Sequence, residues 1–399
     1  MNTTTTSLIS DPVGVMVYLL GLIAVIYWAQ GQPRFGKVFK YLPPVIWIYF
    51  LPMFSTTLGI TPPASPLYEF VKLNLLPAAL ILLLLSSNIR ELAHLGPKAL
   101  GTMLFGTVGI VVGGVVALAL FGHWLPEDAW KGMGALSGSW IGGSANMVAI
   151  GTSIGTRDDL FGIMIIVDTV VGYGWMGVVI FLSAFQERLD KWNGVDASHI
   201  DDMDARMQAV GEANRRPLTF RELSLMVFIG LGFGYLALQA GNYLPDVGSV
   251  ITSFAWTIII VSIIGLLLSL TRFSSLEYAG ASHVGNIFLY LLLATIGAKA
   301  DLQAITQAPM FLVAGVVWII IHATILFFGG KLLKAPMFLI ATSSQANIGG
   351  VVSAPIIASV YRKSLAPVGL LMGVVGNVIG IYFGLLTAQL MAWVANIYF

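Results

Sequence analysis

Five polar side chains beside paired glycines stand out in an otherwise apolar chain. Residues 138–151 read GSWIGGSANMVAIG, and residues 341–355 read ATSSQANIGGVVSAP. Serine, asparagine and glutamine supply hydrogen-bond donors and acceptors, and glycine permits tight turns and close backbone approach. Groups of this kind can hold a small solute. The predicted solute-binding residues are Gly142, Gly143, Ser144, Asn146, Ser344, Gln345, Asn347, Gly349 and Gly350.

An acidic residue, Asp168, lies inside the apolar run FGIMIIVDTVVGYGW. A carboxylate within a membrane is costly unless it pairs with a cation or a proton. We therefore expect Asp168 to couple solute movement to an ion, with Thr169 and Asn377 supplying further oxygen ligands. Sodium suits such a set of oxygens and a proton suits the carboxylate alone, and the sequence does not choose. A permanent structural hydrogen bond is the alternative interpretation.

Other polar residues predict less chemistry. His322 can carry protons near neutral pH, but a lone histidine in a helix bundle is interpreted as a hydrogen-bonded structural group. Lys299 and Asp301 are interpreted as a solvated pair in a loop, and the Met and Trp residues as packing and interface anchors. The chain has no cysteine, which excludes disulfides and thiolate metal sites. We expect no structural metal and no cofactor, with Na⁺ as a candidate bound ion.

Composition predicts an all-α polytopic membrane protein. Apolar residues make up 57% of the 399 positions and charged residues only 10%, against about a quarter charged in soluble domains. A net charge of +1 gives no indication of a nucleic-acid partner. Apolar runs of about 20 residues, the length needed to cross a bilayer, predict ten spans near 13–29, 41–60, 67–87, 99–121, 160–184, 222–240, 250–270, 285–299, 309–329 and 366–393.

The chain divides into two halves that repeat. Ser144-Ala145-Asn146 aligns with Gln345-Ala346-Asn347 at an offset of 201, and DTVVG at 168–172 aligns with GNVIG at 376–380 at an offset of 208. Broken elements at corresponding positions of two repeats indicate the binding site of a secondary transporter. We predict an N-terminal repeat (1–185; scaffold 13–87, core 99–184), a partly helical cytoplasmic linker (186–221) and a C-terminal repeat (222–399; scaffold 222–299, core 309–393).

The broken segments 131–157 and 335–361 either cross the membrane or turn back within it. Short cytoplasmic loops are enriched in Lys and Arg. Full crossing with the N-terminus outside leaves 9 of the 20 Lys and Arg inside, whereas two re-entrant hairpins leave 16 inside and 4 outside. The hairpin arrangement gives five spans per half, an odd number, so the repeats are predicted to be inverted, with both termini outside. Broken backbone is tolerated there only where protein or a wet cavity surrounds it.

Four segments resemble the YjcL-type membrane family: GSWIGGSANMVAIG, LPAALILLLLSSNIRELAHLGPKAL, APMFLIATSSQANIGG and GLLMGVVGNVIG. The resemblance extends from about residue 12 to the end. That family is similar to sodium/glutamate, citrate and bile-acid symporters and to cation–proton antiporters. The resemblance implies an inverted-repeat fold with a core domain, a scaffold domain that often forms a homodimer, and an organic anion as substrate.

The sequence therefore predicts a secondary active transporter of a small organic anion, coupled to Na⁺ or H⁺, working by elevator-like alternating access in a bacterial inner membrane. A passive channel is the alternative. An intramembrane enzyme is disfavoured: GALSGS at 134–139 has the wrong spacing for a rhomboid serine, and an aspartyl protease needs a second membrane aspartate beside Asp168. The expected partners are the solute, the lipid bilayer and a second copy of the chain.

Overall fold

Every regular element in the described part of the chain is a helix. The computed structural model describes residues 7–42, 44–85, 95–195, 217–248, 250–300, 308–361 and 365–398. In these ranges the only β-type pairing is an isolated bridge between Val247 and Ile251. The protein is an all-α polytopic membrane protein, as its composition predicts. Asp301 and most of the linker 186–221 lie outside the described residues.

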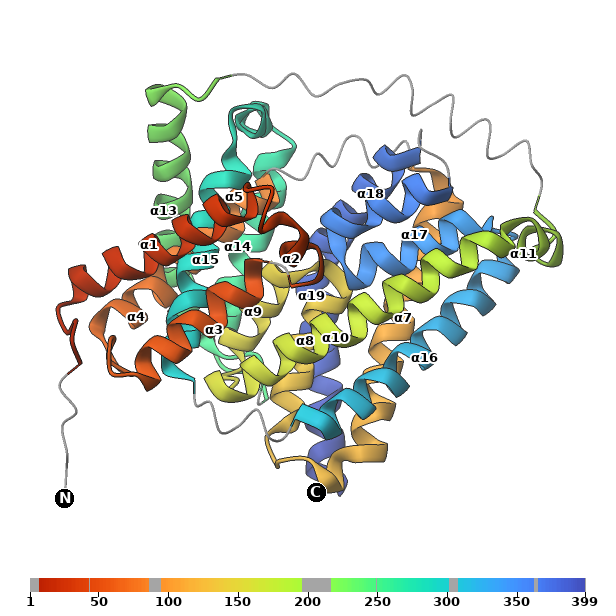
Figure 1. The fold of residues 1–399 in the computed structure, drawn as a ribbon, viewed down its shortest axis with the longest axis horizontal. Coiled ribbons are helices and arrows are strands. Elements are labelled where there is room, and N and C mark those ends of the chain that lie inside the picture. The colour runs from red at the N-terminus through yellow and green to blue at the C-terminus, as the bar shows by residue number, and fades with distance from the viewer. Residues whose placement is uncertain are drawn as a thin grey trace.

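One group of helices packs around α5 and α15, and we call it the scaffold group (Figure 1). Its members are α1 (Pro12–Gln30), α2 (Gly36–Tyr41), α3 (Pro44–Thr57), α4 (Pro66–Phe70) with the π-helix η1 (Val71–Leu75) and α5 (Leu76–Leu85), α13 (Phe220–Asn242), α14 (Ser253–Ser269), η5 (Arg272–Ala279) and α15 (Ala281–Lys299).

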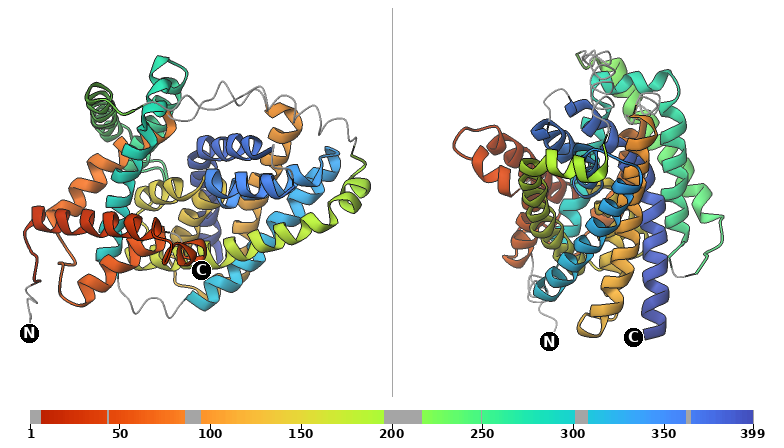
Figure 2. Two further views of the ribbon diagram at one scale, coloured as in Figure 1. Left: turned by 45° about the horizontal axis from the view of Figure 1, so that its top comes forward. Right: turned by 90° about the vertical axis from the view of Figure 1, so that its right-hand side faces the viewer.

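The remaining helices pack around α7 and α19, and we call them the core group (Figure 2). Its members are α7 (Gly96–Phe121), η3 (Gly122–Trp124), α8 (Ala129–Gly142), α9 (Ser144–Ser153), α10 (Asp158–Leu182), η4 (Ser183–Phe185), α11 (Gln186–Asn193), α16 (Ala308–Leu332), α17 (Met337–Ile348), α18 (Gly350–Tyr361) and α19 (Ala366–Tyr398).

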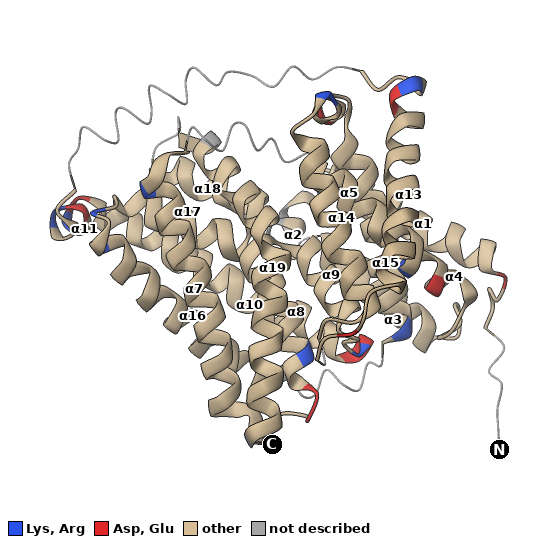
Figure 3. Ribbon diagram, turned by 180° about the vertical axis from the view of Figure 1, so that it is seen from behind, with Lys and Arg blue, Asp and Glu red and all other residues tan. Residues whose placement is uncertain are grey.

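The apolar runs of the sequence coincide with the long helices of the structure. Eight described helices are long and apolar enough to cross a membrane, and α14 with η5 adds a ninth as a pair bent by 92°. In Figure 3 the long helices are tan along most of their length, and the charged residues lie mostly at their ends. The expected span 41–60 is shorter than predicted: α3 has 14 residues, which extend over about 21 Å and fall short of the hydrocarbon thickness.

Small residues let the core helices approach closely. A Cβ built on Gly109 would lie 2.9 Å from the backbone of His322, and one built on Gly113 would lie 2.7 Å from the Trp318 ring. Helix association inside a membrane depends on such close packing. α7 and α16 are therefore closely packed, and both contact α17.

The packing partners of the two halves correspond. α3 packs on α15 as α14 packs on α5, α1 packs on α3 as α13 packs on α14, and α19 packs on α7 as α10 packs on α16. α5 packs on α15, and α7 packs on α16, so helices that occupy the same place in the two halves also pack on one another. Two related repeats would give packing partners that correspond in this way. The inverted repeat itself stays a prediction.

The segment predicted to be broken at 131–157 folds back on itself. The Thr156 hydroxyl donates to the Lys131 carbonyl oxygen over 3.1 Å, and Arg157 forms an ion pair with Asp128 at 3.3 Å. A Cβ on Gly151 would lie 3.0 Å from the Cβ of Ala135. The two ends of the segment therefore meet, and α8 and α9 form a helical hairpin, which we call hairpin 1.

The segment predicted to be broken at 335–361 folds back in the same way. α17 and α18 pack on one another, and residues from both ends, Ala335 and Met337 with Ile357, share one buried cluster. We call α17 and α18 hairpin 2. Both segments thus have the shape of a hairpin, and their orientation relative to a bilayer stays a prediction.

Candidate functional site

Hairpin 1 turns at Gly143. This residue has φ 88° and ψ 177°, a conformation that side chains with a Cβ rarely adopt. A Cβ on Gly142 would overlap the carbonyl oxygen of Gly376 on α19. The paired glycines therefore do two tasks: one makes the turn, and the other lets the turn touch α19.

Hairpin 2 turns at the corresponding glycines. Gly350 has φ 60°, and a Cβ built on it would lie 3.7 Å from the Cα of Gly143. The two breaks, about half the chain apart in sequence, are therefore in contact. The backbones of the two turns make this contact.

Both breaks rest on the same helix, α19. A Cβ on Gly376 would lie 2.5 Å from the carbonyl oxygen of Ile141 in hairpin 1 and 3.1 Å from that of Ala346 in hairpin 2. These carbonyls belong to the last turns of α8 and α17, where carbonyl groups lack partners within the helix. The first turns of α9 and α18 start at the same place and present N–H groups. Both signs of helix-end partial charge are thus available at the breaks.

Hairpin 1 contributes two of the predicted polar residues to this contact. Ser144 is half-buried at the turn. The Asn146 amide nitrogen donates to the Asn377 carbonyl oxygen over 3.3 Å. The Asn377 side-chain oxygen would lie 3.8 Å from a Cβ on Gly143. Ser144, Asn146 and Asn377 therefore gather at the break.

Hairpin 2 uses two of its predicted residues to hold itself in place. The Ser344 hydroxyl accepts from the Trp175 indole at 2.7 Å and lies 2.9 Å from the Nε2 of His322. Asn347 accepts from the Thr107 hydroxyl at 3.0 Å. The Asn347 amide nitrogen also donates to the Ser343 carbonyl oxygen over 3.0 Å. Ser344 and Asn347 are fully partnered and point toward α7, α10 and α16.

Gln345 differs from both. Its side-chain oxygen accepts from the Ser353 hydroxyl on α18 at 3.0 Å. Its amide nitrogen has no hydrogen-bond partner in the described residues, although the side chain is only 1% exposed. A buried amide without a partner costs about 1–3 kcal/mol, so this donor is one that a bound molecule would satisfy. A Cβ on Gly349 would lie 2.9 Å from the Gln345 oxygen, which places the amide at the break.

Asp168 lies beside hairpin 1 and is half-buried. Its two oxygens accept from the Ser139 hydroxyl at 2.9 Å and from the Trp140 indole at 2.8 Å. Asp168 forms none of the ion pairs found among the described residues. A Cβ on Gly172 would lie 4.0 Å from the Asp168 Oδ1 and 3.4 Å from Ile348. The carboxylate is therefore near the turns of both hairpins and has no ion-pair partner among the described side chains.

The other two predicted ion-coupling residues form no hydrogen bond with Asp168 in the described part of the chain. The Thr169 hydroxyl donates to the Ile165 carbonyl oxygen of its own helix over 2.8 Å. Asn377 lies at the break of hairpin 1, as described above. The sequence argument missed the carboxylate's actual partners, Ser139 and Trp140, because it treated tryptophan as packing.

His322 has a structural environment. Its Nδ1 lies 2.9 Å from the Gly106 carbonyl oxygen, and its Nε2 faces the Ser344 hydroxyl. The ring is fully buried. Nδ1–H donates to the carbonyl and Nε2 accepts from the hydroxyl in the neutral tautomer that fits this geometry. The histidine ties α16 and α7 to hairpin 2.

Lys299 has a charged partner that the sequence did not predict. Its ammonium lies 3.0 Å from the Asp158 carboxylate, whereas the expected pair was with Asp301. Asp158 begins α10 and is far away in sequence, so local spacing gave no signal for the contact. Asp301 lies outside the described residues.

Comparison with known proteins defines the family. Residues 17–394 match the model of a family described as "Protein of unknown function (DUF819)". The chain belongs to this family. It is also similar to a protein of Bacillus subtilis (strain 168) named "Uncharacterized membrane protein YjcL", with 25% identity over 394 residues, covering 94% of this chain and 96% of the relative. The resemblance inferred from the sequence is thus confirmed, and the relative's name agrees with a membrane protein.

Proposed function

We propose that this member of the DUF819 family is a secondary active transporter of a small organic anion, coupled to Na⁺ or H⁺. The observation that carries the proposal is the meeting of two glycine turns, one from each half, on α19. Broken helices that meet at the junction of two repeats are typical of solute sites in such transporters. The correspondence of packing partners between the halves supports the repeat that this mechanism needs.

The solute is proposed to bind at the turns. The residues assigned to it are Ser144 and Asn146 of hairpin 1 and the amide of Gln345 in hairpin 2, with backbone groups of Gly142, Gly143, Gly349 and Gly350. The helix N-termini of α9 and α18 and the unpartnered Gln345 amide are donors, which suits a carboxylate. Ser344 and Asn347 are assigned the role of holding hairpin 2 in position.

Ion coupling is proposed to run through Asp168. The carboxylate is held by two neutral donors and lacks a cation among the described residues, so it is available to a proton or a sodium ion. Asn377 is retained as an oxygen ligand at the turn, and Thr169 as a lesser candidate. The account needs no cofactor and no enzymatic step.

Transport is proposed to occur by movement of the core group against the scaffold group in an elevator-like cycle. The two groups are packed mainly within themselves, which supports movement as units. We further propose a homodimer in a bacterial inner membrane with both termini outside, in contact with lipid and with no nucleic-acid partner.

Uptake into proteoliposomes tests the proposal. Purified protein is first screened for thermal stabilisation by small mono-, di- and tricarboxylates with and without sodium, and the stabilising solute is then used in radiolabelled form. A transporter accumulates the solute above its equilibrium level when an inward Na⁺ or H⁺ gradient is imposed, and an ionophore abolishes the accumulation. Equilibration that ignores the gradient would identify a passive channel instead.

A further inference from the structure

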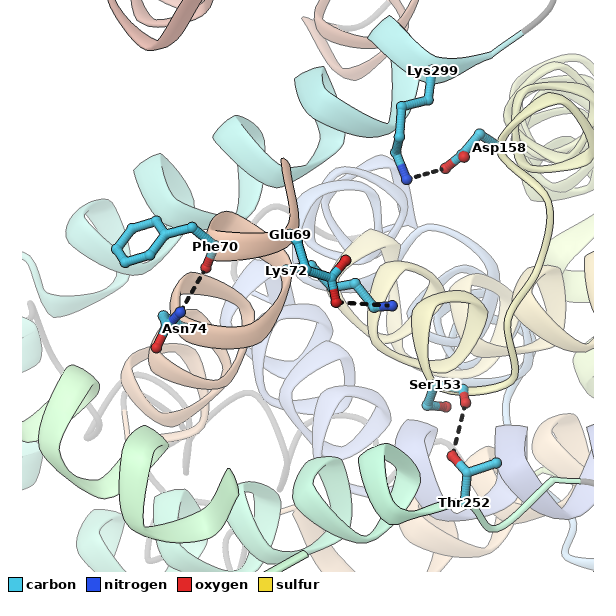
Figure 4. Close-up of polar contacts among 8 residues, drawn as sticks. All are labelled: Glu69, Phe70, Lys72, Asn74, Ser153, Asp158, Thr252 and Lys299. Carbon is cyan, nitrogen blue, oxygen red and sulfur yellow. Dashed lines mark hydrogen bonds and ion pairs between the residues drawn. The ribbon is translucent and has the colours of Figure 1, made fainter. Parts of the chain in front are cut away.

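Polar contacts between the scaffold and core groups lie at the base of hairpin 1 (Figure 4) and, apart from it, between the hydroxyls of Ser262 on α14 and Tyr382 on α19, at 2.8 Å. The Lys299 ammonium, at the end of α15, lies 3.0 Å from the Asp158 carboxylate at the start of α10. The Thr252 hydroxyl, just before α14, donates to the carbonyl oxygen of Ser153, the last residue of α9, over 3.2 Å. The Tyr49 hydroxyl of α3 donates to the Asp158 carbonyl oxygen. Three scaffold helices thus hold one end of the hairpin.

The ion pair is favourable yet weak enough to break. A cation at a helix C-terminus and an anion at a helix N-terminus each complement the helix dipole. The Lys299 and Asp158 side chains are 33% and 29% exposed, and ion pairs reached by solvent are worth little. Such a pair suits a contact that forms and opens in turn.

The other charges near Asp158 have ion pairs of their own. Arg157 pairs with Asp128 at 3.3 Å and with Asp159 at 3.2 Å, both within the core group. Lys72, which also appears in Figure 4, pairs with Glu69 of its own helix at 3.8 Å. Among the described residues, Lys299 is therefore the scaffold cation that forms an ion pair with Asp158.

Hairpin 2 has no equivalent contact. Its base is held by core elements: Asp190 of α11 accepts from the Met337 N–H at 2.6 Å, and Asn193 donates to the Ala335 carbonyl oxygen over 3.1 Å. No hydrogen bond or ion pair within the described residues joins α17 or α18 to a scaffold helix. In the described residues, therefore, hairpin 1 forms a hydrogen bond with the scaffold group and hairpin 2 does not.

We propose that Lys299–Asp158 and Thr252–Ser153 form a latch that fixes one of two positions of the core group on the scaffold group. The proposal rests on the proposed function, since a transport cycle requires the two groups to shift. In the other position the latch is open and the base of hairpin 1 is released. The latch is a conformational device and is separate from the solute site at the turns.

Cross-linking tests whether the latch must open. The native chain has no cysteine, so Ser153→Cys with Thr252→Cys gives a pair that a short bifunctional thiol reagent can join. Lys131→Cys with Thr156→Cys is the matched control, because the same kind of hydroxyl-to-carbonyl contact joins these residues within hairpin 1. We expect cross-linking of the latch pair to reduce coupled uptake at least about tenfold, with the control pair unaffected. Full uptake by the cross-linked latch pair would refute the latch.

A second measurement needs no solute. The single variant Thr252→Cys is labelled with a small water-soluble thiol reagent in membranes, with and without Lys299→Gln. We expect labelling to become about twofold to fivefold faster without the ion pair, in line with the modest strength of exposed pairs. The exchanged pair Lys299→Asp with Asp158→Lys should restore part of the slow rate, because the attraction returns while both charges oppose their helix dipoles. Lys72→Gln, which breaks no ion pair with Asp158, should change the rate less than Lys299→Gln. An unchanged rate in Lys299→Gln overturns the latch, whereas absence of gradient-driven uptake in the native protein overturns the proposed function.

Discussion

Hairpins 1 and 2 look alike in sequence but hold their polar residues differently. Ser144 of hairpin 1 lies half-buried at the turn, and Asn146 and Ser139 of the same hairpin bond to α19 and to Asp168. In hairpin 2, Ser344 and Asn347 are buried and bound to α7, α10 and α16. The described Gln345 side chain keeps a donor without a partner at the second turn.

This difference distinguishes residues that are available to bind the solute from residues that hold a hairpin in place. A polar group that is buried and fully hydrogen-bonded contributes to stability and specifies one packing. A polar group at a turn that is half-buried or lacks a partner has capacity for a ligand. Hairpin 2 is thus the more firmly anchored element in the core group, and hairpin 1 is the one that also contacts the scaffold.

Gly376→Ala should have the largest effect, because it disturbs both hairpins at once. The added Cβ would meet two backbone carbonyl oxygens, at 2.5 and 3.1 Å, which cannot move away as a flexible side chain would. Overpacking of this kind costs about 1–3 kcal/mol. We expect a lower melting temperature in detergent and loss of uptake. Gly174→Ala is the control, since nothing lies within 4 Å of its Cβ position. An equal effect of Gly174→Ala would contradict the claim that both turns rest on α19 at Gly376.

Asp168→Asn should abolish coupling while preserving the fold around hairpin 1. An asparagine can accept from the Trp140 indole and donate to the Ser139 hydroxyl, so both hydrogen bonds survive and only the charge is lost. We expect gradient-driven uptake to fall at least about tenfold with little change in melting temperature. Asp159→Asn, at the rim of the core group, should transport normally. Normal coupling in Asp168→Asn would exclude this carboxylate from the ion site.

Asn347→Leu and Gln345→Leu should separate support from recognition within hairpin 2. Asn347→Leu removes the hydrogen bond from the Thr107 hydroxyl, which then keeps only the Met103 carbonyl oxygen, and the bond to the Ser343 carbonyl oxygen. We therefore expect unfolding to become easier by about 1–3 kcal/mol. Gln345→Leu removes an amide whose nitrogen has no partner and whose oxygen accepts one bond from the half-buried Ser353 hydroxyl, so it should lower the melting temperature less than Asn347→Leu does. The solute-induced rise in melting temperature should disappear in Gln345→Leu. A retained rise in that variant would mean that Gln345 does not bind the solute.

Substitutions at the bases of the hairpins should lower the thermal stability least. Asp190→Ala removes the acceptor of the Met337 N–H at the start of α17 and should cost about 1 kcal/mol, as loss of a helix cap does. Arg157→Gln at the base of hairpin 1 should cost less, because its ion pairs are exposed to solvent. Thermal unfolding of the two variants side by side measures the order, and the reverse order would contradict the picture of hairpin 2 as the more firmly anchored element.

Much of the fold follows from the sequence. Apolar runs predicted the positions of the long helices, and the Gly142–Gly143 and Gly349–Gly350 pairs marked both turns. The rotation of each helix about its own axis did not follow, because it depends on neighbours far away in the chain. That rotation turns Asn347 toward Thr107 and leaves Gln345 at the break. For the same reason neither the Trp140–Asp168 contact nor the Lys299–Asp158 pair could be predicted from the sequence.

The most direct test of the central claim, that the meeting turns form the solute site, is thiol labelling of Ser144→Cys in the otherwise cysteine-free chain. The account predicts that a small water-soluble reagent labels this residue, that the stabilising carboxylate slows the labelling, and that the labelled protein no longer takes up solute. The buried Ser137→Cys should remain unlabelled under the same conditions. Complete labelling of Ser144→Cys with full uptake retained would contradict the account.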